Sequence, residues 1–284
     1  MRGIDHIVLP VHDLDAAAAS YHTLGFTLTP RNHHPFGTAN RLIQLQGSFL
    51  ELVTIERPEL VKETTGSDFS FAAFNRDFLE RDGEGASMLV LESSDAWRDL
   101  AGFEREGLKT YAPFEFSRQA RLPDGSEATV GFKLGYVAVP EMPDLMLFVC
   151  QQLAPQHFWK PEFQTHTNGA IMIHDIAVVA NDPLALQGIF DVFVGGKGEV
   201  SGNSVVWPTQ RGRISVVTPD DFHDTYGYES RPGRIAEITI GASGHRGLIN
   251  DLDAAGFVAF RSRNRAVIDR KLTYGVCLAF EDLG

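Results

Sequence analysis

The stretch GIDHIVLPVHDLDAA, residues 3–17, decides the fold. It begins as an apolar, strand-like run and then reaches Asp13, whose side chain can accept hydrogen bonds from the free amides at the start of a helix. An alanine-rich segment follows, with apolar residues spaced for one face of a helix. His6 is the polar ring inside the apolar run. It is either a metal ligand or an interior histidine with a hydrogen-bond partner.

The same order of strand, capping residue, helix and glycine recurs along the chain. Asp95 and Asp182 stand where Asp13 does, and a fourth copy opens at 234 with its helix expected from His245. Further strand-like runs follow each helix, so we expect an α+β protein of four β-α-β-β-β modules. We expect an N-terminal domain at 1–153 (modules about 1–57 and 86–153), a linker at 154–170, a C-terminal domain at 171–284 (modules about 171–219 and 234–284), and a loop at 219–233.

Composition excludes several classes of partner. The chain has 284 residues, is 43% hydrophobic and carries a formal net charge of -12, so it can bury a large core but would repel nucleic acid and anionic membranes. No apolar run approaches the roughly 18 residues of a spanning helix. Cys150 and Cys277 lie in apolar runs, which predicts buried free thiols and a cytoplasmic location.

Three segments resemble the vicinal oxygen chelate superfamily, and within it the glyoxalase-like domain proteins. They are GIDHIVLPVHDLDAA, HHPFGTANRLIQLQGSFLELV (33–53) and HTNGAIMIHDIAVVANDP (166–183). The resemblance implies that modules pair, one with two and three with four, into two half-open barrels. It also implies a metal site built from His, Glu or Gln on the first and last strands of paired modules. Members include glyoxalase I-type lyases, extradiol dioxygenases, epimerases, isomerases and metal-free drug binders.

Strand alternation brings two candidate residues to one cavity. His6 shares a face with Val8, and Glu51 shares a face with Phe49 and Val53, opposite the leucines that suit packing against a helix. A buried glutamate is costly unless it is paired or bound to a metal. His6 and Glu51 also match the ligand positions of the superfamily, so we expect them to be the catalytic pair, as metal ligands or as a dyad.

The second module does not complete a metal site. Met88 stands at the position of His6, and Met146, Leu147 or Phe148 at that of Glu51. A third ligand would come from His33 or His34, and His34 would complete a set of two histidines and one carboxylate that suits one divalent metal such as Zn, Fe, Mn or Ni.

If His6 and Glu51 act as a dyad without a metal, no third ligand is needed. Glu51 could orient His6 as a general base that removes a proton next to a carbonyl. The loop with His34, Thr38 and Asn40 and the guanidinium of Arg118 would then hold a small, anionic ligand. Without catalysis, the same cavity would make the protein a metal-free binder of small molecules, of the bleomycin-resistance type.

The second pair of modules lacks a convergent ligand set. Asp175 stands at the position of His6, with His174 one residue out of register, and Glu237 and Cys277 lie on strands of the fourth module. We expect this half to be structural or to pair two chains in a homodimer. The predicted function is that of an enzyme of the lyase, isomerase or dioxygenase type acting on a small oxygenated metabolite in the N-terminal pair, and an interaction module without catalysis is the weakest alternative.

Overall fold

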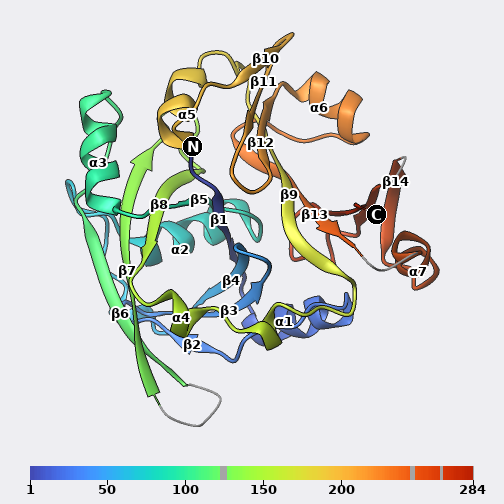
Figure 1. The fold of residues 1–284 in the computed structure, drawn as a ribbon, viewed down its shortest axis with the longest axis horizontal. Helices are drawn as coiled ribbons and strands as arrows, with labels where there is room; N and C mark the ends of the chain where they lie inside the picture. The colour runs from blue at the N-terminus through green and yellow to red at the C-terminus, as the bar shows by residue number, and fades with distance from the viewer. Residues whose placement is uncertain (122–126, 244–246, 263–264, 284) are drawn as a thin grey trace.

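The computed structural model describes residues 1–121, 127–243, 247–262 and 265–283, and it contains two eight-stranded sheets (Figure 1). The N-terminal sheet has the order β2-β3-β4-β1-β5-β8-β7-β6, so the first strands of modules one and two lie side by side at its centre. Its strands are β1 (Ile4–Pro10), β2 (Asn32–His33), β3 (Thr38–Gln44), β4 (Phe49–Ile55), β5 (Met88–Glu92), β6 (Phe114–Arg121), β7 (Glu127–Ala138) and β8 (Met146–Gln152).

The C-terminal sheet repeats this topology with the order β10-β11-β12-β9-β13-β16-β15-β14. In every module the first strand pairs in parallel with the last, as β1 does with β4 and β9 with β12. The predicted α+β fold of four paired modules is therefore confirmed. The strands are β9 (Ala170–Val179), β10 (Glu199–Ser201), β11 (Ser204–Pro208), β12 (Arg213–Val217), β13 (Arg234–Ala242), β14 (Val258–Ser262), β15 (Arg265–Ile268) and β16 (Leu278–Asp282).

One helix of each module follows its first strand. Asp13 caps the first of them by accepting from the amides of Asp15 and Ala16, and Asp95 accepts from the amide of Arg98. Asp182 caps only a turn, so the third helix begins later than expected. The expected start of the fourth helix lies outside the described residues. The module helices are α1 (Leu14–Thr23), α3 (Ala96–Arg105), α5 (Gln187–Val194) and α7 (Leu248–Ala254).

Two helices lie in the segments that connect modules within a half. Helix α2 (Phe71–Asp82) follows module one, in a stretch for which no element was expected. Helix α6 (Pro219–Tyr226) corrects the prediction of a loop at 219–233. Thr218 accepts from the amide of Asp221, and Gly227, with φ 88°, ends the helix in the left-handed conformation. Shorter turns of helix are η1 (Pro58–Leu60), α4 (Pro155–Phe158) and η2 (Pro161–Phe163).

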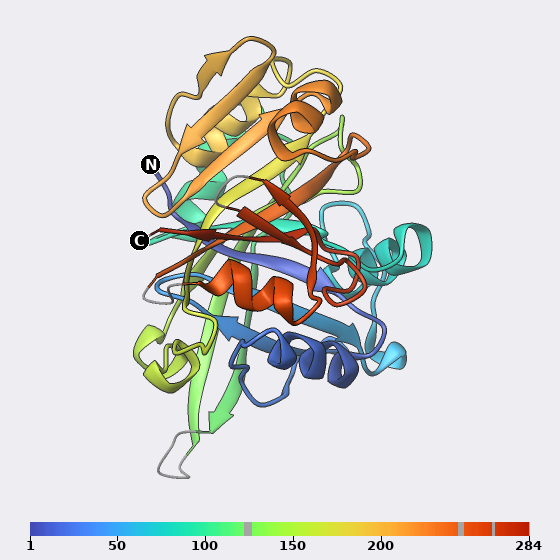
Figure 2. The ribbon, with the colours of Figure 1, turned by 90° about the vertical axis from the view of Figure 1, so that its right-hand side faces the viewer.

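The two halves lie against each other (Figure 2), and the largest apolar cluster of the described residues contains side chains of both. It contains the sheet faces that point away from the barrel interiors, together with the module helices. Phe26 stacks on Phe280 with ring centroids 5.6 Å apart, and Phe103 lies 6.1 Å from Phe193. The hydroxyl of Ser20 also donates to the carbonyl of Leu272 in the C-terminal half. Each half therefore supports the other through its helices.

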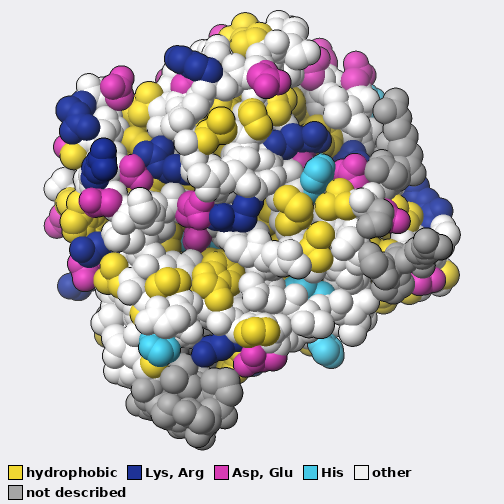
Figure 3. Space-filling view, viewed as in Figure 1, with side chains coloured by type: hydrophobic (Ala, Val, Ile, Leu, Met, Phe, Trp, Pro, Cys, Tyr) yellow, Lys and Arg dark blue, Asp and Glu magenta, His cyan; other side chains and the backbone are white. Residues whose placement is uncertain are grey.

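Figure 3 shows basic and acidic side chains interspersed over the face it displays. Among the helices of the described ranges, none has the length and apolar character needed to cross a bilayer.

Candidate functional site

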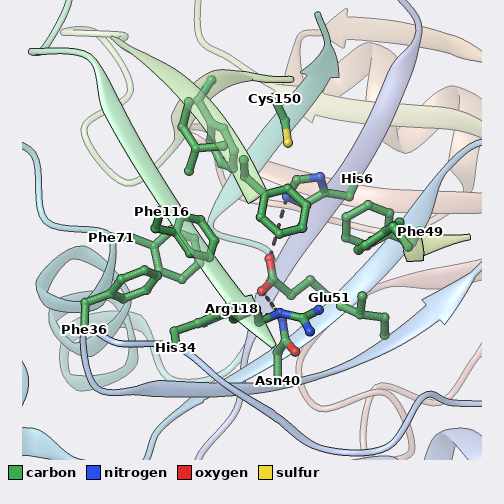
Figure 4. Close-up of a pocket in the computed structure, with 15 residues that line it drawn as sticks. His6, His34, Phe36, Asn40, Phe49, Glu51, Phe71, Phe116, Arg118 and Cys150 are labelled. Carbon is green, nitrogen blue, oxygen red and sulfur yellow. Dashed lines mark hydrogen bonds and ion pairs between the residues drawn. The ribbon is translucent and has the colours of Figure 1, made fainter. Parts of the chain in front are cut away.

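The interior of the N-terminal barrel holds a cavity of about 50 Å³ (Figure 4). Strands β1, β3, β4 and β6 aim His6, Asn40, Glu51 and Arg118 into it, and phenylalanine side chains form most of the remaining wall. The alternation predicted for β1 and β4 is confirmed. Val8 and Phe49 face the barrel interior, while the leucines of β4 pack in the core between the halves. The cavity thus combines a few polar groups with an apolar wall, as small-molecule sites do.

His6 is held from both sides. Its Nδ1 lies 2.6 Å from Asp5 Oδ2, and the amide of Gln152 donates to the other oxygen of Asp5 at 3.2 Å. The imidazole stacks on Phe49 with centroids 4.3 Å apart and meets the edge of Phe148 at 5.4 Å. Because a carboxylate can only accept from Nδ1–H, neutral His6 has its lone pair on Nε2. That nitrogen points toward Glu51 (Figure 4).

Glu51 lies next to His6 in the wall of the cavity. Its Oε2 lies 3.6 Å from His6 Nε2, and Asn40 donates to its Oε1 at 2.6 Å. Burial raises the pKa of Glu51, against the opposing effects of His6 and the Asn40 hydrogen bond. Burial therefore makes protonation of Glu51 easier than in a free glutamate, and in the protonated form Oε1 still accepts from Asn40 while Oε2 carries the proton.

Arg118 supplies the positive charge of the site. Its Nη1 donates to Asn32 Oδ1 at 3.0 Å, and this bond joins the two edge strands of the sheet, β6 and β2. Burial lowers the pKa of Arg118 to about 10, so the guanidinium stays charged at neutral pH. Its Nε is buried and has no hydrogen-bond partner in the described residues.

His34 lines the cavity, but its ring nitrogens contact residues of its own hairpin. Its Nδ1 lies 2.7 Å from Thr38 Oγ1, and its Nε2 lies 3.3 Å from the amide nitrogen of Asn40. Burial lowers the pKa of His34 to about 3, so the ring is neutral. Thr38 does not line the cavity and reaches it only through His34. His33 points outward to Glu56, with its Nδ1 2.6 Å from Oε2.

The donor set does not fit the metal site that the superfamily implies. In the described part of the chain, no three side chains of His, Cys, Asp or Glu come together in a way that could hold a metal ion. Strand register pairs Val8 with Glu51 and Val90 with Phe148, so Phe148 takes the position equivalent to Glu51. Met88, paired with Val8, takes the position equivalent to His6. We therefore derive no reaction step through a metal.

The C-terminal barrel is filled by its own chain. Phe222 and Tyr226 of α6 pack against β9 and β12, and Tyr228 packs on the strands of module four. Asp175 accepts from Tyr226 Oη and from Ser215 Oγ, each at 2.9 Å, and pairs with Arg213 at 3.1 Å. His174 lies outside this network, with its Nε2 3.7 Å from Glu281.

The second buried carboxylate of this barrel is satisfied in the same way. Glu237 accepts from Tyr228 Oη at 2.7 Å and from Thr239 Oγ1 at 2.8 Å, and it pairs with Arg265. Cys277 is buried but lies just before β16, not on a strand as expected, and its carbonyl accepts from the amide of Ile238. Both carboxylates are therefore occupied by side chains of this half.

Two residues of the site were missed by sequence reasoning. Strict alternation puts Asp5 on the face opposite His6, so it is not predicted as part of the site. An acid next to a histidine in an apolar strand is nevertheless a signal that could identify it. A bulge in the β1–β5 register leaves Asp5 without a partner residue, so alternation does not hold there. Gln152 carried no signal in the sequence. Cys150 also lines the cavity, and it and Cys277 are buried free thiols as predicted.

A family model described as a glyoxalase-like domain matches residues 4–192. This chain belongs to the glyoxalase-like domain family. The match begins at β1 and extends beyond the N-terminal sheet into α5, so it includes every residue of the cavity. A comparison with curated protein sequences gives no match.

Solved structures share the fold of this glyoxalase-like protein at low sequence identity. A hypothetical protein from Staphylococcus aureus has a TM-score of 0.74 and 15% identity, with 100% of both chains covered. A mutant of 4-hydroxymandelate synthase from Streptomyces coelicolor has a TM-score of 0.60 and 10% identity, over 99% of this chain and 93% of that one. A xylose isomerase-like TIM barrel/4-hydroxyphenylpyruvate dioxygenase fusion protein has a TM-score of 0.58 and 13% identity, over 99% and 48%. These similarities establish the arrangement of paired half-barrels.

Proposed function

We propose that this glyoxalase-like protein binds a small anionic carbonyl compound in its N-terminal barrel, 1–153, and moves a proton at the carbon next to the carbonyl. The reaction class is isomerase or lyase. The supporting observation is the line formed by Asp5, His6 and Glu51, in which a histidine with a carboxylate on Nδ1 faces a second carboxyl 3.6 Å from Nε2. An oriented base and an acid side by side in the wall of one cavity can act on neighbouring atoms of a ligand, the carbon next to a carbonyl and the carbonyl oxygen.

The proton transfer uses both groups. His6 Nε2 takes a proton from the carbon next to the carbonyl, and the electron pair of that C–H bond forms the carbon–carbon double bond of an enol. Glu51 Oε2–H gives its proton to the carbonyl oxygen as the C=O π bond breaks. Asp5 stabilises the imidazolium that forms and fixes the ring orientation. Return of a proton to a different carbon, or to the other face, completes an isomerisation.

Arg118 would hold the anionic group of the ligand. Its unpaired Nε and its charge suit a carboxylate, and the phenylalanine wall excludes water that would weaken this attraction. Asn40 keeps Glu51 in place from the opposite side through its 2.6 Å hydrogen bond.

Deuterium exchange tests the proposal even while the natural substrate is unidentified. Pyruvate, 2-oxobutanoate and related 2-oxo acids are incubated with the protein in D₂O, and loss of the C–H signal is followed by proton NMR. We expect at least one acid to exchange faster than in buffer, and His6→Gln to slow that exchange by about 10²–10⁴-fold. His33→Gln is the matched control, because His33 is exposed and bonded to Glu56. Equal exchange in the wild type and in His6→Gln contradicts the assignment.

A second function, metal-free binding without turnover, is favoured by the composition of the wall. Phenylalanines from four strands, from α2 and from α4 surround the polar groups. A binder would take up the same anions in an Arg118-dependent way and give no exchange with any of them.

The metal-dependent reaction of the superfamily is the rival to both functions. It requires that protein purified without added metal or a histidine tag carry stoichiometric zinc, iron, manganese or nickel. It also requires that this metal be lost in both His6→Ala and Glu51→Ala. Elemental analysis of the three proteins separates this reaction from the metal-free proposal.

A further inference from the structure

A second hollow opens beside the cavity. This outer cleft has a volume of about 740 Å³ and is formed by residues from 35–36, 60–72 and 112–116. Its floor is apolar, with Leu60, Phe69 and Phe114 among the lining residues, and its charged side chains are exposed. Three of its lining residues are acids, Glu63, Asp68 and Glu115, and Glu63 is paired with Arg76 at 2.8 Å.

Three phenylalanines belong to both hollows. Phe36, Phe71 and Phe116 line the cavity and also line the outer cleft, so only the thickness of one side chain separates the two spaces. Phe36 lies 5.2 Å from Phe116 and 5.8 Å from Phe71 between ring centroids. We call these three rings the phenylalanine collar. Rotation of aromatic side chains, without movement of the backbone, would connect the spaces.

Strand β6 runs from one hollow to the other. Arg118 lines the cavity, Phe116 belongs to the collar, and Phe114 lines the outer cleft. Since side chains two residues apart share a face of a strand, these three lie in one row that spans roughly 13 Å from Arg118 to Phe114. The charged end of the row is in the cavity and its apolar end is in the cleft.

The cavity alone is too small for most metabolites. At about 50 Å³ it offers space for a few non-hydrogen atoms, because one water already takes roughly 10–15 Å³ of such volume. A ligand whose anionic group reaches Arg118 must therefore extend through the collar if it is larger than a very small acid.

We propose that the outer cleft is a binding subsite for the apolar tail of the ligand, so that the ligand is a carboxylic acid with a medium-length apolar chain. The carboxylate pairs with Arg118, the chain passes the phenylalanine collar, and its end packs against Phe114 and Phe69. This assignment rests on the proposed function for the anion site and adds the size and polarity of the rest of the molecule.

Binding of straight-chain acids tests the subsite. Isothermal titration calorimetry with acetate, butanoate, hexanoate and octanoate should give affinities that rise by up to about fourfold per added methylene, the value expected for burial of a CH₂ group. Ala112→Trp, at a half-buried position that lines only the cleft, should remove this gain for octanoate and leave acetate unchanged. Ala112→Ser is the control of nearly equal size. Phe114→Ala should weaken octanoate selectively, without placing any new bulk in the cleft.

The outcomes separate the subsite from the anion site. Equal affinities for all four acids, each weakened by Arg118→Met, overturn the subsite and leave the anion site in place. A chain-length gain that survives both Ala112→Trp and Phe114→Ala overturns it as well. Binding that Arg118→Met does not weaken contradicts the anion site of the proposed function.

Discussion

The two barrels of this protein have the same strand order and opposite interiors. In the N-terminal barrel, α2 and the phenylalanine collar leave a cavity around His6 and Glu51. In the C-terminal barrel, the segment that begins with α6 enters the equivalent space and brings Tyr226 and Tyr228 against Asp175 and Glu237.

The difference shows that strand positions alone do not make a site. Asp175 takes the position of His6, and Ser215 takes that of Glu51, since the register pairs Ala177 with Ser215 as it pairs Val8 with Glu51. In the C-terminal barrel these two groups bond to each other, with the Ser215 hydroxyl donating to Asp175. In the N-terminal barrel, Arg118 keeps a donor unpaired within the described ranges. An open cavity beside the polar groups, rather than their polarity, distinguishes the candidate site.

Two buried glutamates, one in each barrel, give the largest expected contrast. Glu237→Ala leaves the largely buried Arg265 without its carboxylate and should lower the free energy of unfolding by about 3–5 kcal/mol. Glu51→Gln keeps the shape of a neutral carboxyl and its acceptor for Asn40, so stability should change by less than about 1 kcal/mol. Urea unfolding of both variants measures this, and an equal loss in the two would remove the distinction between the barrels.

A pair of tyrosines should give a smaller contrast. Tyr226→Phe removes a donor from buried Asp175 and should cost about 1–3 kcal/mol of unfolding free energy. The hydroxyl of Tyr136 is buried and has no hydrogen-bond partner in the part of the N-terminal barrel that the structure describes. Tyr136→Phe should leave stability unchanged or raise it by about 1 kcal/mol. Thermal and urea unfolding test both predictions. Destabilisation by Tyr136→Phe would mean that the Tyr136 hydroxyl does make a hydrogen bond in the folded protein.

The titration of Glu51 gives the smallest predicted effect. Its pKa is raised above the ordinary 4.5, so the folded state binds the proton more tightly than the unfolded state. Its contribution to stability is therefore full below pH 4.5 and is lost as the pH rises through the raised pKa, with a slope of at most about 1.4 kcal/mol per pH unit. Urea unfolding between pH 4 and 8 should show this fall in the wild type, and Glu51→Gln should lack that component. Parallel curves would mean that Glu51 titrates normally.

The sequence was sufficient to predict the modules and the inward faces of β1 and β4. Both depend on local periodicity and on capping residues such as Asp13, which the sequence displays directly. The signals for α6 were also present, since Thr218, Pro219 and Gly227 are an N-cap, a first-turn proline and a C-terminal glycine, but the surrounding glycine and proline content was read as a loop.

Other features depend on contacts between distant parts of the chain. The role of Asp5 follows from a bulge and from Gln152, 147 residues away. The collar brings together Phe36, Phe71 and Phe116 from a hairpin turn, a connecting helix and an edge strand. No local pattern specifies which of the aromatic side chains meet in such a place, because their positions follow from long-range strand pairing.

The bond between Arg118 and Asn32 has a consequence beyond ligand binding. It ties β6 to β2, the first and last strands of an otherwise open sheet. Unpaired strand edges are templates for association with other chains, and closing a barrel shields them. Strand β14 of the other sheet presents the partly exposed Phe260 at its edge. We therefore expect the arginine proposed to hold the ligand also to keep these two edges joined, so that its loss favours insoluble protein even where folding is intact.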